Sequence, residues 1–142
     1  NVIPNEVKLM GTFRAMDEAW RSKAHELIAN QVRATEQSTG AVIEMNIDKG
    51  YPMVFNDETL TTKAWHLADE FAGKNKVSET ELRLGAEDFG YYAQRVPGCF
   101  FRLGAGNKSK GISSNVHTPT FNIDESAIEN GMGMMAWLGT QV

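Results

Sequence analysis

The sequence predicts an α/β protein made of two units. Segments in which apolar residues alternate are interleaved with segments in which they recur at helical spacing, and this order is typical of a sheet covered by helices. The turn-forming residues Gly50 and Pro52 interrupt the pattern. We therefore expect one domain over residues 1–50 and another over residues 51–142.

The first unit is expected to form a strand, an amphipathic helix and a second strand. Apolar and polar side chains alternate over residues 6–13, as in a half-buried strand. Asp17 is suited to cap the following helix and Gly40 to end it. The apolar stripe of that helix consists of Trp20, Ala24, Leu27, Ile28 and Val32. The second strand is predicted from alternating apolar residues, namely Ala41, Ile43, Met45 and Ile47.

The second unit is expected to begin with another helix. Either Asn56 or Asp57 can cap this helix, which is predicted to end near Gly73. Its apolar stripe consists of Leu60, Ala64, Leu67, Ala68 and Phe71. Short strands are predicted over residues 76–84 and 99–104.

The end of the chain is predicted to hold a short helix stopped by Pro97, a polar glycine-rich loop and a final helix. The loop spans residues 104–115, and Asp124 is suited to cap the helix after it. The inner face of this helix is predicted to consist of Ile128, Met132, Met135 and Leu138.

Composition and charge exclude several classes of function. The hydrophobic fraction of 42% and the charged fraction of 23% are those of a soluble globular protein. The net charge of -4, without a basic stripe, argues against nucleic acid as a partner, and no apolar run is long enough to span a membrane. A cytoplasmic location is expected, although the single cysteine, Cys99, leaves the redox compartment open. The opening residues, which lack Met, suggest that the chain begins inside a larger protein.

Few residues point to chemistry by spacing alone. The three histidines show no HxxxH or HxH pattern, so His25 and His66 are interpreted as surface residues. His117 differs because it lies in a loop two residues before Pro119, yet a loop histidine is more often structural or solvated than a metal ligand.

Two further features allow two interpretations each. The adjacent carboxylates of Glu87 and Asp88 at a helix start favour capping over an active-site role. Gly104 and Gly106 permit close approach of the backbone to a ligand, but the third glycine of a dinucleotide fingerprint is missing.

Five segments of the chain together resemble the M20 metallopeptidase family. Its closest branch is that of the amidohydrolases acting on N-acyl amino acids, such as hippurate hydrolase and the auxin-conjugate hydrolases. Each segment is a modest signal, but their common order is specific. In chain order they are NVIPNEVKLMGTFR, GYPMVFND, GAEDFGYY, VPGCFFRLGAGN and VHTPTFNIDESAI.

The resemblance implies that the chain is the C-terminal part of such an enzyme. Residues 1–50 would be the second half of a ferredoxin-like lid or dimerisation domain with a βαββαβ pattern. Residues 51–142 would belong to the catalytic α/β domain. The resemblance also implies a homodimer formed through the lid.

The same resemblance implies roles for particular residues. His117 matches a family histidine that binds one of two divalent metal ions, which could be zinc, manganese or cobalt. The remaining ligands and the general-base glutamate would lie upstream of this chain. The positions that match substrate-binding residues are Asn1, Arg14, Glu87, Gly104 and Gly106. Ala86 stands where the family's GSEDF loop has serine, so that hydroxyl is absent.

The function implied is metal-assisted hydrolysis of the amide bond of N-acyl amino acids. Two alternatives stay open: a peptidase of the same family acting on dipeptides, and a non-catalytic dimerisation or binding module of the same fold. We expect the chain by itself to be inactive, because it offers one metal ligand where a catalytic site needs several.

Overall fold

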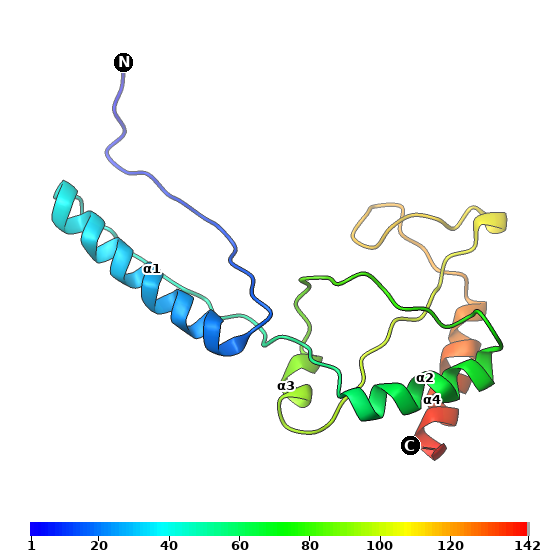
Figure 1. Ribbon diagram of the computed structural model, residues 1–142. Helices are drawn as coiled ribbons and strands as arrows, with labels where there is room; N and C mark the ends of the chain where they lie inside the picture. The colour runs from blue at the N-terminus through cyan, green and yellow to red at the C-terminus, as the bar shows by residue number, and fades with distance from the viewer. Residues whose placement is uncertain (142) are drawn as a thin grey trace. The chain divides into compact units, whose positions relative to one another are not determined.

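The computed structural model describes residues 1–141 of the chain (Figure 1). Over these residues the secondary structure consists of the helices α1 (Glu18–Thr39), α2 (Glu58–Ala72), α3 (Phe89–Ala93) and α4 (Ser126–Gln141), with a short 3₁₀ helix, η1 (Lys108–Lys110), before α4. None of these helices combines the length and the apolar character needed to cross a bilayer.

The chain folds into two compact units. Unit 1 comprises Asn1–Met53 and Leu82–Asp88. Unit 2 comprises Val54–Glu81 and the described residues from Phe89 onward. Unit 1 contains α1, and unit 2 contains the other helices.

The helix α1 begins and ends at the residues that the sequence predicts. The side chain of Asp17 accepts a hydrogen bond from the backbone N–H of Trp20, which satisfies one of the free donors of the first turn. Gly40 ends the helix in the left-handed conformation, with φ of 73°, and its N–H donates to the carbonyl of Glu36. Along the predicted stripe only Ala24 is buried, and Trp20 is 52% exposed.

The segment after α1 returns along the helix. The backbone N–H of Ile43 donates to the Glu36 carboxylate near the C-terminal end of α1. In this segment Ile43 and Ile47 are half-buried, whereas Ala41 and Met45, which the predicted strand would place on the same face, are exposed. At the other end of the segment, Arg21 donates to the carbonyls of Lys49 and Tyr51.

The main difference between the prediction and the structure concerns the strands. Within residues 1–141 none of the four predicted segments forms a strand, and the single β-bridge, Asn107 to Ile112, lies outside them. A strand requires a neighbour that pairs with its backbone groups along its length. The described residues do not supply one, so they do not form the predicted α/β sheet by themselves. The segments concerned are 6–13, 41–47, 76–84 and 99–104.

The core of unit 2 lies between α2 and α4. Asp57, rather than Asn56, caps α2 by accepting from the N–H of Leu60 at 2.8 Å, and Gly73 ends the helix as predicted. Across the interface, the indole N–H of Trp137 donates to the carbonyl of Leu67 at 3.0 Å.

Small residues on α4 let two large side chains approach the helix closely. A Cβ atom added at Gly133 would lie 2.7 Å from the ring of Phe71, and one added at Gly131 would lie 2.8 Å from Leu103. Buried Leu138 completes this face, as predicted. The prediction is wrong for the other three residues, because α4 buries a neighbouring stripe that contains Ala127, Gly131 and Leu138. Ile128, Met132 and Met135 are exposed by 51%, 64% and 60%.

Asn56 joins two segments of unit 2. Its side-chain amide donates to the carbonyl of Phe100 at 2.9 Å, and its side-chain oxygen accepts from the N–H of the same residue at 2.8 Å. One residue further, the N–H of Asp57 donates to the carbonyl of Gly98. The start of α2 is thereby held against residues 98–100.

Candidate functional site

His117 lies on an exposed turn with an unusual backbone conformation. Its φ of 62° is in the left-handed region, where residues other than glycine are uncommon. Such conformations cost about 1–3 kcal/mol and persist only where the surroundings impose them. They also cluster at functional sites. His117 is therefore the strongest single candidate for a functional side chain in this chain.

Hydrogen bonds within the loop hold the turn around His117. The hydroxyl of Thr118 donates to the carbonyl of Asn115 at 2.8 Å, and the N–H of Phe121 donates to the carbonyl of Thr118. The hydroxyls of Ser114 and Thr120 lie 2.8 Å apart across the loop. The imidazole is thus carried on a loop with its own internal support.

The segment that contains Gly104 and Gly106 forms the base of this loop. Ala105, between the two glycines, accepts from the N–H of Asp124 at 2.8 Å. A Cβ atom at Gly106 would lie 3.4 Å from the carbonyl oxygen of Ile112, so the backbone passes close there. The structure therefore places Gly104 and Gly106 in the segment to which both ends of the loop of His117 are bonded.

A buried carboxylate, Asp124, stands at the centre of this base. It is 8% exposed and accepts from the side-chain amide of Asn107 at 2.5 Å and from the ammonium group of Lys110 at 2.8 Å. It also accepts from the N–H of Ser126 at the start of α4, in agreement with its predicted position before that helix.

The same contacts set the protonation state of Asp124. The hydrogen bond from Lys110, followed by that from Asn107, holds the pKa of the Asp124 carboxyl well below its usual range. Burial acts in the opposite direction and is outweighed. Asp124 is therefore an anion at neutral pH and fixes the two donors around it.

The remaining predicted residues lie in unit 1. The guanidinium group of Arg14 donates to the carbonyl of Leu84 at 2.5 Å, which joins Arg14 to the segment that carries half-buried Glu87. Within residues 1–141 these two side chains form no ion pair. Asn1 lies at the exposed start of the chain (Figure 1).

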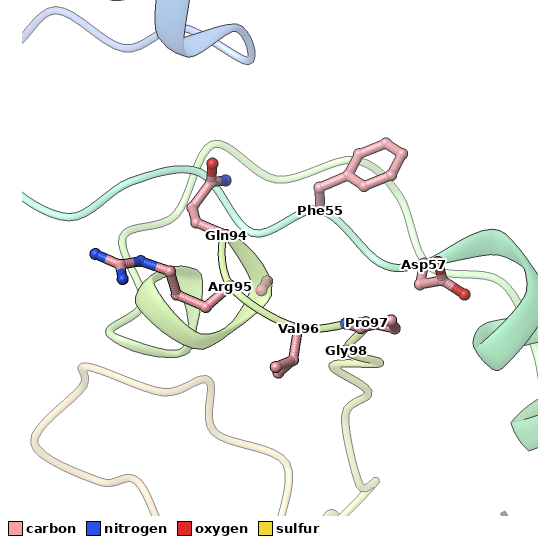
Figure 2. Close-up of a pocket in the computed structure, with 8 residues that line it drawn as sticks. Phe55, Asp57, Gln94, Arg95, Val96, Pro97 and Gly98 are labelled. Carbon is pink, nitrogen blue, oxygen red and sulfur yellow. The ribbon is translucent and has the colours of Figure 1, made fainter.

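An open depression of about 270 Å³ in unit 2 is separate from these residues. It is lined by the start of α2 and by the turn that leaves α3, with Phe55, Asp57 and residues 93–98 around it (Figure 2). Figure 2 shows the side chain of Arg95 extending away from Asp57. None of the predicted site residues lines the depression, so it is not the site that the sequence predicts.

The described residues do not form a metal centre on their own. Across residues 1–141 no group of three or more His, Cys, Asp or Glu side chains lies close enough to hold an ion. The exposed imidazole of His117, on its supported turn, fits the part of one ligand contributed to a site that is completed by other chain segments. Asp124 is committed to Lys110 and Asn107.

The sequence interpretation missed the pairing of Asn107 and Lys110 with Asp124. The sequence offers one indication of this pairing, which is that both residues lie in segments that resemble the family. Asn107 ends the VPGCFFRLGAGN segment, and Asp124 lies in the VHTPTFNIDESAI segment. Neither residue type nor spacing reveals that the two side chains meet.

The comparisons with known proteins place the chain in a family. Residues 6–139 match the peptidase family M20/M25/M40. The "Thermostable carboxypeptidase 2" of Saccharolobus solfataricus is 33% identical over 92% of this chain and 33% of its own length. The "Putative amidohydrolase YhaA" of Bacillus subtilis is 33% identical over 96% of this chain and 34% of its own length.

A plant protein is similar over the same region. The "IAA-amino acid hydrolase ILR1-like 5" of Arabidopsis thaliana is 30% identical over 99% of this chain and 33% of its own length. The chain thus spans about a third of the length of these relatives. No solved structure matches it. Because the family match covers nearly all of its residues, the chain belongs to peptidase family M20/M25/M40.

Proposed function

We propose that the chain is the C-terminal part of a metal-dependent amidohydrolase that cleaves the amide bond of N-acyl amino acids. Its family is generally metal-dependent and has a peptidase-like fold. The observation that carries the proposal is the left-handed turn that presents His117 within a sequence matching the family from residue 6 to residue 139. A strained turn under an exposed imidazole is expected where that imidazole has a ligand to hold.

The chain's own part in the reaction is binding and positioning. A pair of divalent ions, when bound, supplies a nucleophilic water at neutral pH and polarises the amide carbonyl. His117 would contribute one neutral imidazole to that site. Its stiff loop loses little conformational entropy when the ligand is engaged. Gly104 and Gly106 would line the substrate cleft beside it.

As the family resemblance implies, Arg14 and Asn1 would help to bind the carboxylate of the substrate, and Glu87 would belong to a loop near the metal site. A guanidinium group has five N–H donors, and the contact of Arg14 with Leu84 uses one nitrogen. The other nitrogens remain suited to a two-pronged contact with a carboxylate. Exposed Arg14 is therefore chemically suited to recognise the free carboxyl end of an N-acyl amino acid.

We further propose the domain division expected from the sequence. Residues 1–50 would be half of a lid or dimerisation domain, and residues 51–142 part of an α/β catalytic domain. The exposed apolar side chains of unit 1 support this, because further chain or a second subunit would cover them and pair the unpaired segments. The most exposed of them are Val2, Ile3, Leu9, Met10 and Val42.

The names of the relatives support two substrate classes. "IAA-amino acid hydrolase" and "amidohydrolase" favour an acyl group linked to an amino acid. "Carboxypeptidase" favours the alternative, a peptide. Both classes place a free carboxylate next to the scissile amide, which Arg14 would bind in either case.

Turnover by the full-length protein tests the proposal. Purified protein is freed of metal with a chelator, reloaded separately with zinc, manganese or cobalt, and assayed with N-acyl amino acids and with dipeptides. We expect activity to disappear with the metal, to return with it, and to be higher on N-acyl amino acids. A preference for dipeptides would establish the alternative, and chelator-insensitive turnover would contradict metal dependence.

A further inference from the structure

We propose that Asn107 and Asp124 form a clamp that positions His117 by holding both ends of its loop. The role of His117 as a ligand rests on the proposed function, whereas the clamp rests on the contacts of the loop. The clamp consists of Asn107, Asp124 and their partner Lys110, and the loop consists of residues 113–123.

Both ends of the loop are fixed to one short segment. At the first end, Asn107 and Ile112 exchange two backbone hydrogen bonds, of 2.8 Å and 2.9 Å. At the second end, the N–H of Asp124 donates to the carbonyl of Ala105 at 2.8 Å. The eleven residues between Ile112 and Asp124 therefore start and finish within the reach of residues 105–107. Closing the loop in this way restricts the positions open to His117.

The Asn107 side chain joins the two ends directly. Its amide nitrogen donates to Asp124, while its oxygen accepts from both the N–H and the hydroxyl of Ser109. Asn107 thus contacts the start of the loop through its backbone and the end of the loop through its side chain. An alanine at this position would keep the backbone bonds and lose the connection between the ends.

The charge of Asp124 makes this connection strong. A hydrogen bond from an amide to a carboxylate is stronger than one between neutral groups, and Asp124 is buried. Lys110 supplies the opposite charge, although its own side chain is 58% exposed. Removing Asn107 would therefore leave a buried carboxylate with one of its donors missing.

Hydrogen bonds within the loop connect its fixed ends to the turn of His117. With both ends held, the contacts of Thr118 with Asn115 and of Ser114 with Thr120 leave the left-handed turn at His117 as the apex. The side chains of Asn107 and Lys110 are both directed to Asp124 at the base of the loop. Asn107 and Asp124 are therefore positioning residues, which act on substrate and metal through His117.

Hydrogen exchange of backbone amides in the full-length, metal-free protein tests the clamp directly. In the wild type, we expect the amides of Asn107, Ile112 and Asp124 to exchange slowly. In Asn107→Ala, we expect the amides of residues 113–123 to exchange about tenfold faster or more, the factor expected when one hydrogen bond to a charged group is lost. Leu138→Ala, which removes a buried side chain of α4 away from the loop, serves as a destabilised control with unchanged exchange in the loop.

Metal affinity provides the second measurement. Competition with a chromogenic chelator, using zinc alone, gives the affinity of each variant. We expect Asn107→Ala to weaken zinc binding by about 10- to 100-fold, as loss of a supporting residue around a metal ligand does. Leu138→Ala should retain the wild-type affinity, because it leaves the loop in place.

The outcomes separate the clamp from the proposed function. Unchanged loop exchange in Asn107→Ala overturns the clamp, whatever happens to zinc. If Asn107→Ala does not fold, the wild type still tests the clamp. Fast exchange of its Asn107, Ile112 and Asp124 amides would overturn the clamp. Wild-type zinc affinity in Asn107→Ala, with His117→Ala having lost its zinc, overturns the positioning role. Retention of zinc by His117→Ala contradicts the proposed function instead.

Discussion

The guanidinium group of Arg21 lies against the carboxylate of Glu18, three residues before it on α1, and the two side chains together hold the end of unit 1. Arg21 donates to Glu18 at 2.5 Å and 2.9 Å. It also donates to the carbonyls of Lys49 and Tyr51, while Glu18 accepts from the N–H of Met53 at 2.9 Å. The pair therefore fastens the segment 49–53, where the chain leaves unit 1, to the first turn of α1.

Removing the Glu18 carboxylate is expected to release this segment. In Glu18→Ala the Met53 amide loses an acceptor, and the Arg21 side chain, only 16% exposed, loses its counter-charge. We expect a loss of about 1–3 kcal/mol in the local stability of the segment, measured from hydrogen exchange of residues 49–53 in the full-length protein. Glu26→Ala breaks only the exposed Lys23–Glu26 pair and should leave the hydrogen exchange of residues 49–53 unchanged. Equal effects of the two variants would contradict this role of Glu18.

Two glycines of α4 are expected to respond differently to the same substitution. Gly139 has open space where a Cβ would be, so Gly139→Ala should stabilise α4 by about 0.5–1 kcal/mol through helix propensity. Gly133→Ala adds a Cβ 2.7 Å from the ring of Phe71, and overpacking costs about 1–3 kcal/mol. We expect Gly133→Ala to be less stable than Gly139→Ala, as measured by hydrogen exchange of α4 amides. Equal stabilisation by both would show that Phe71 does not pack on Gly133.

Acid is expected to weaken the contribution of Asp124. Its pKa is lowered in the folded protein by Lys110 and Asn107, so the unfolded chain binds the proton more tightly than the folded one. The stability that Asp124 supplies is therefore complete above the ordinary aspartate pKa of about 3.9, and it is lost as the pH falls below that value. Hydrogen exchange of α4, corrected for the intrinsic rate, should show a constant difference between wild type and Asp124→Asn from pH 7 to pH 5, and a shrinking one below pH 4. A difference that grows on acidification would contradict the lowered pKa.

Arg14 is expected to act on substrates through their carboxylate. In Arg14→Ala of the full-length enzyme, kcat/KM for an N-acyl amino acid should fall by about 10- to 100-fold, because a charged hydrogen bond worth about 1.5–3 kcal/mol is lost. The matching amide, which lacks the carboxylate, serves as the control substrate and should be turned over equally by both proteins. An equal loss on both substrates would mean that Arg14 supports the fold through Leu84 instead.

The local parts of the fold could be predicted from the sequence. The helix ends at Asp17, Gly40 and Gly73 are as predicted, and Asp57 is one of the two caps predicted for α2. Capping is predictable because it depends on a side chain and the backbone within one turn of it. Strands could not be predicted with the same success, because the hydrogen bonds of a strand are made with segments that are distant in sequence. Of the apolar residues that predict the second strand only Ile43 and Ile47 are half-buried, and the described residues provide no paired neighbour for this segment.

The buried face of α4 and the contacts around His117 could not be predicted from the spacing of apolar residues. Helical spacing in α4 fits the stripe of Ile128, Met132 and Met135, but the contacting face is chosen by small residues such as Gly133 that admit Phe71. His117 was identified through family resemblance, and its role stays a prediction. Its clamp was not found, because Asn107 and Asp124 meet only once the chain between them has folded back.

Metal analysis of His117→Ala tests the central proposal most directly. Full-length wild type and variant are purified in parallel and dialysed against buffer containing zinc, and their zinc is counted per polypeptide. His66→Ala, at an exposed histidine of α2, serves as the matched control. We expect the wild type and His66→Ala to bind zinc equally and His117→Ala to lose at least one ion together with its activity. The full wild-type zinc content and turnover in His117→Ala would contradict the proposal that this turn presents a metal ligand.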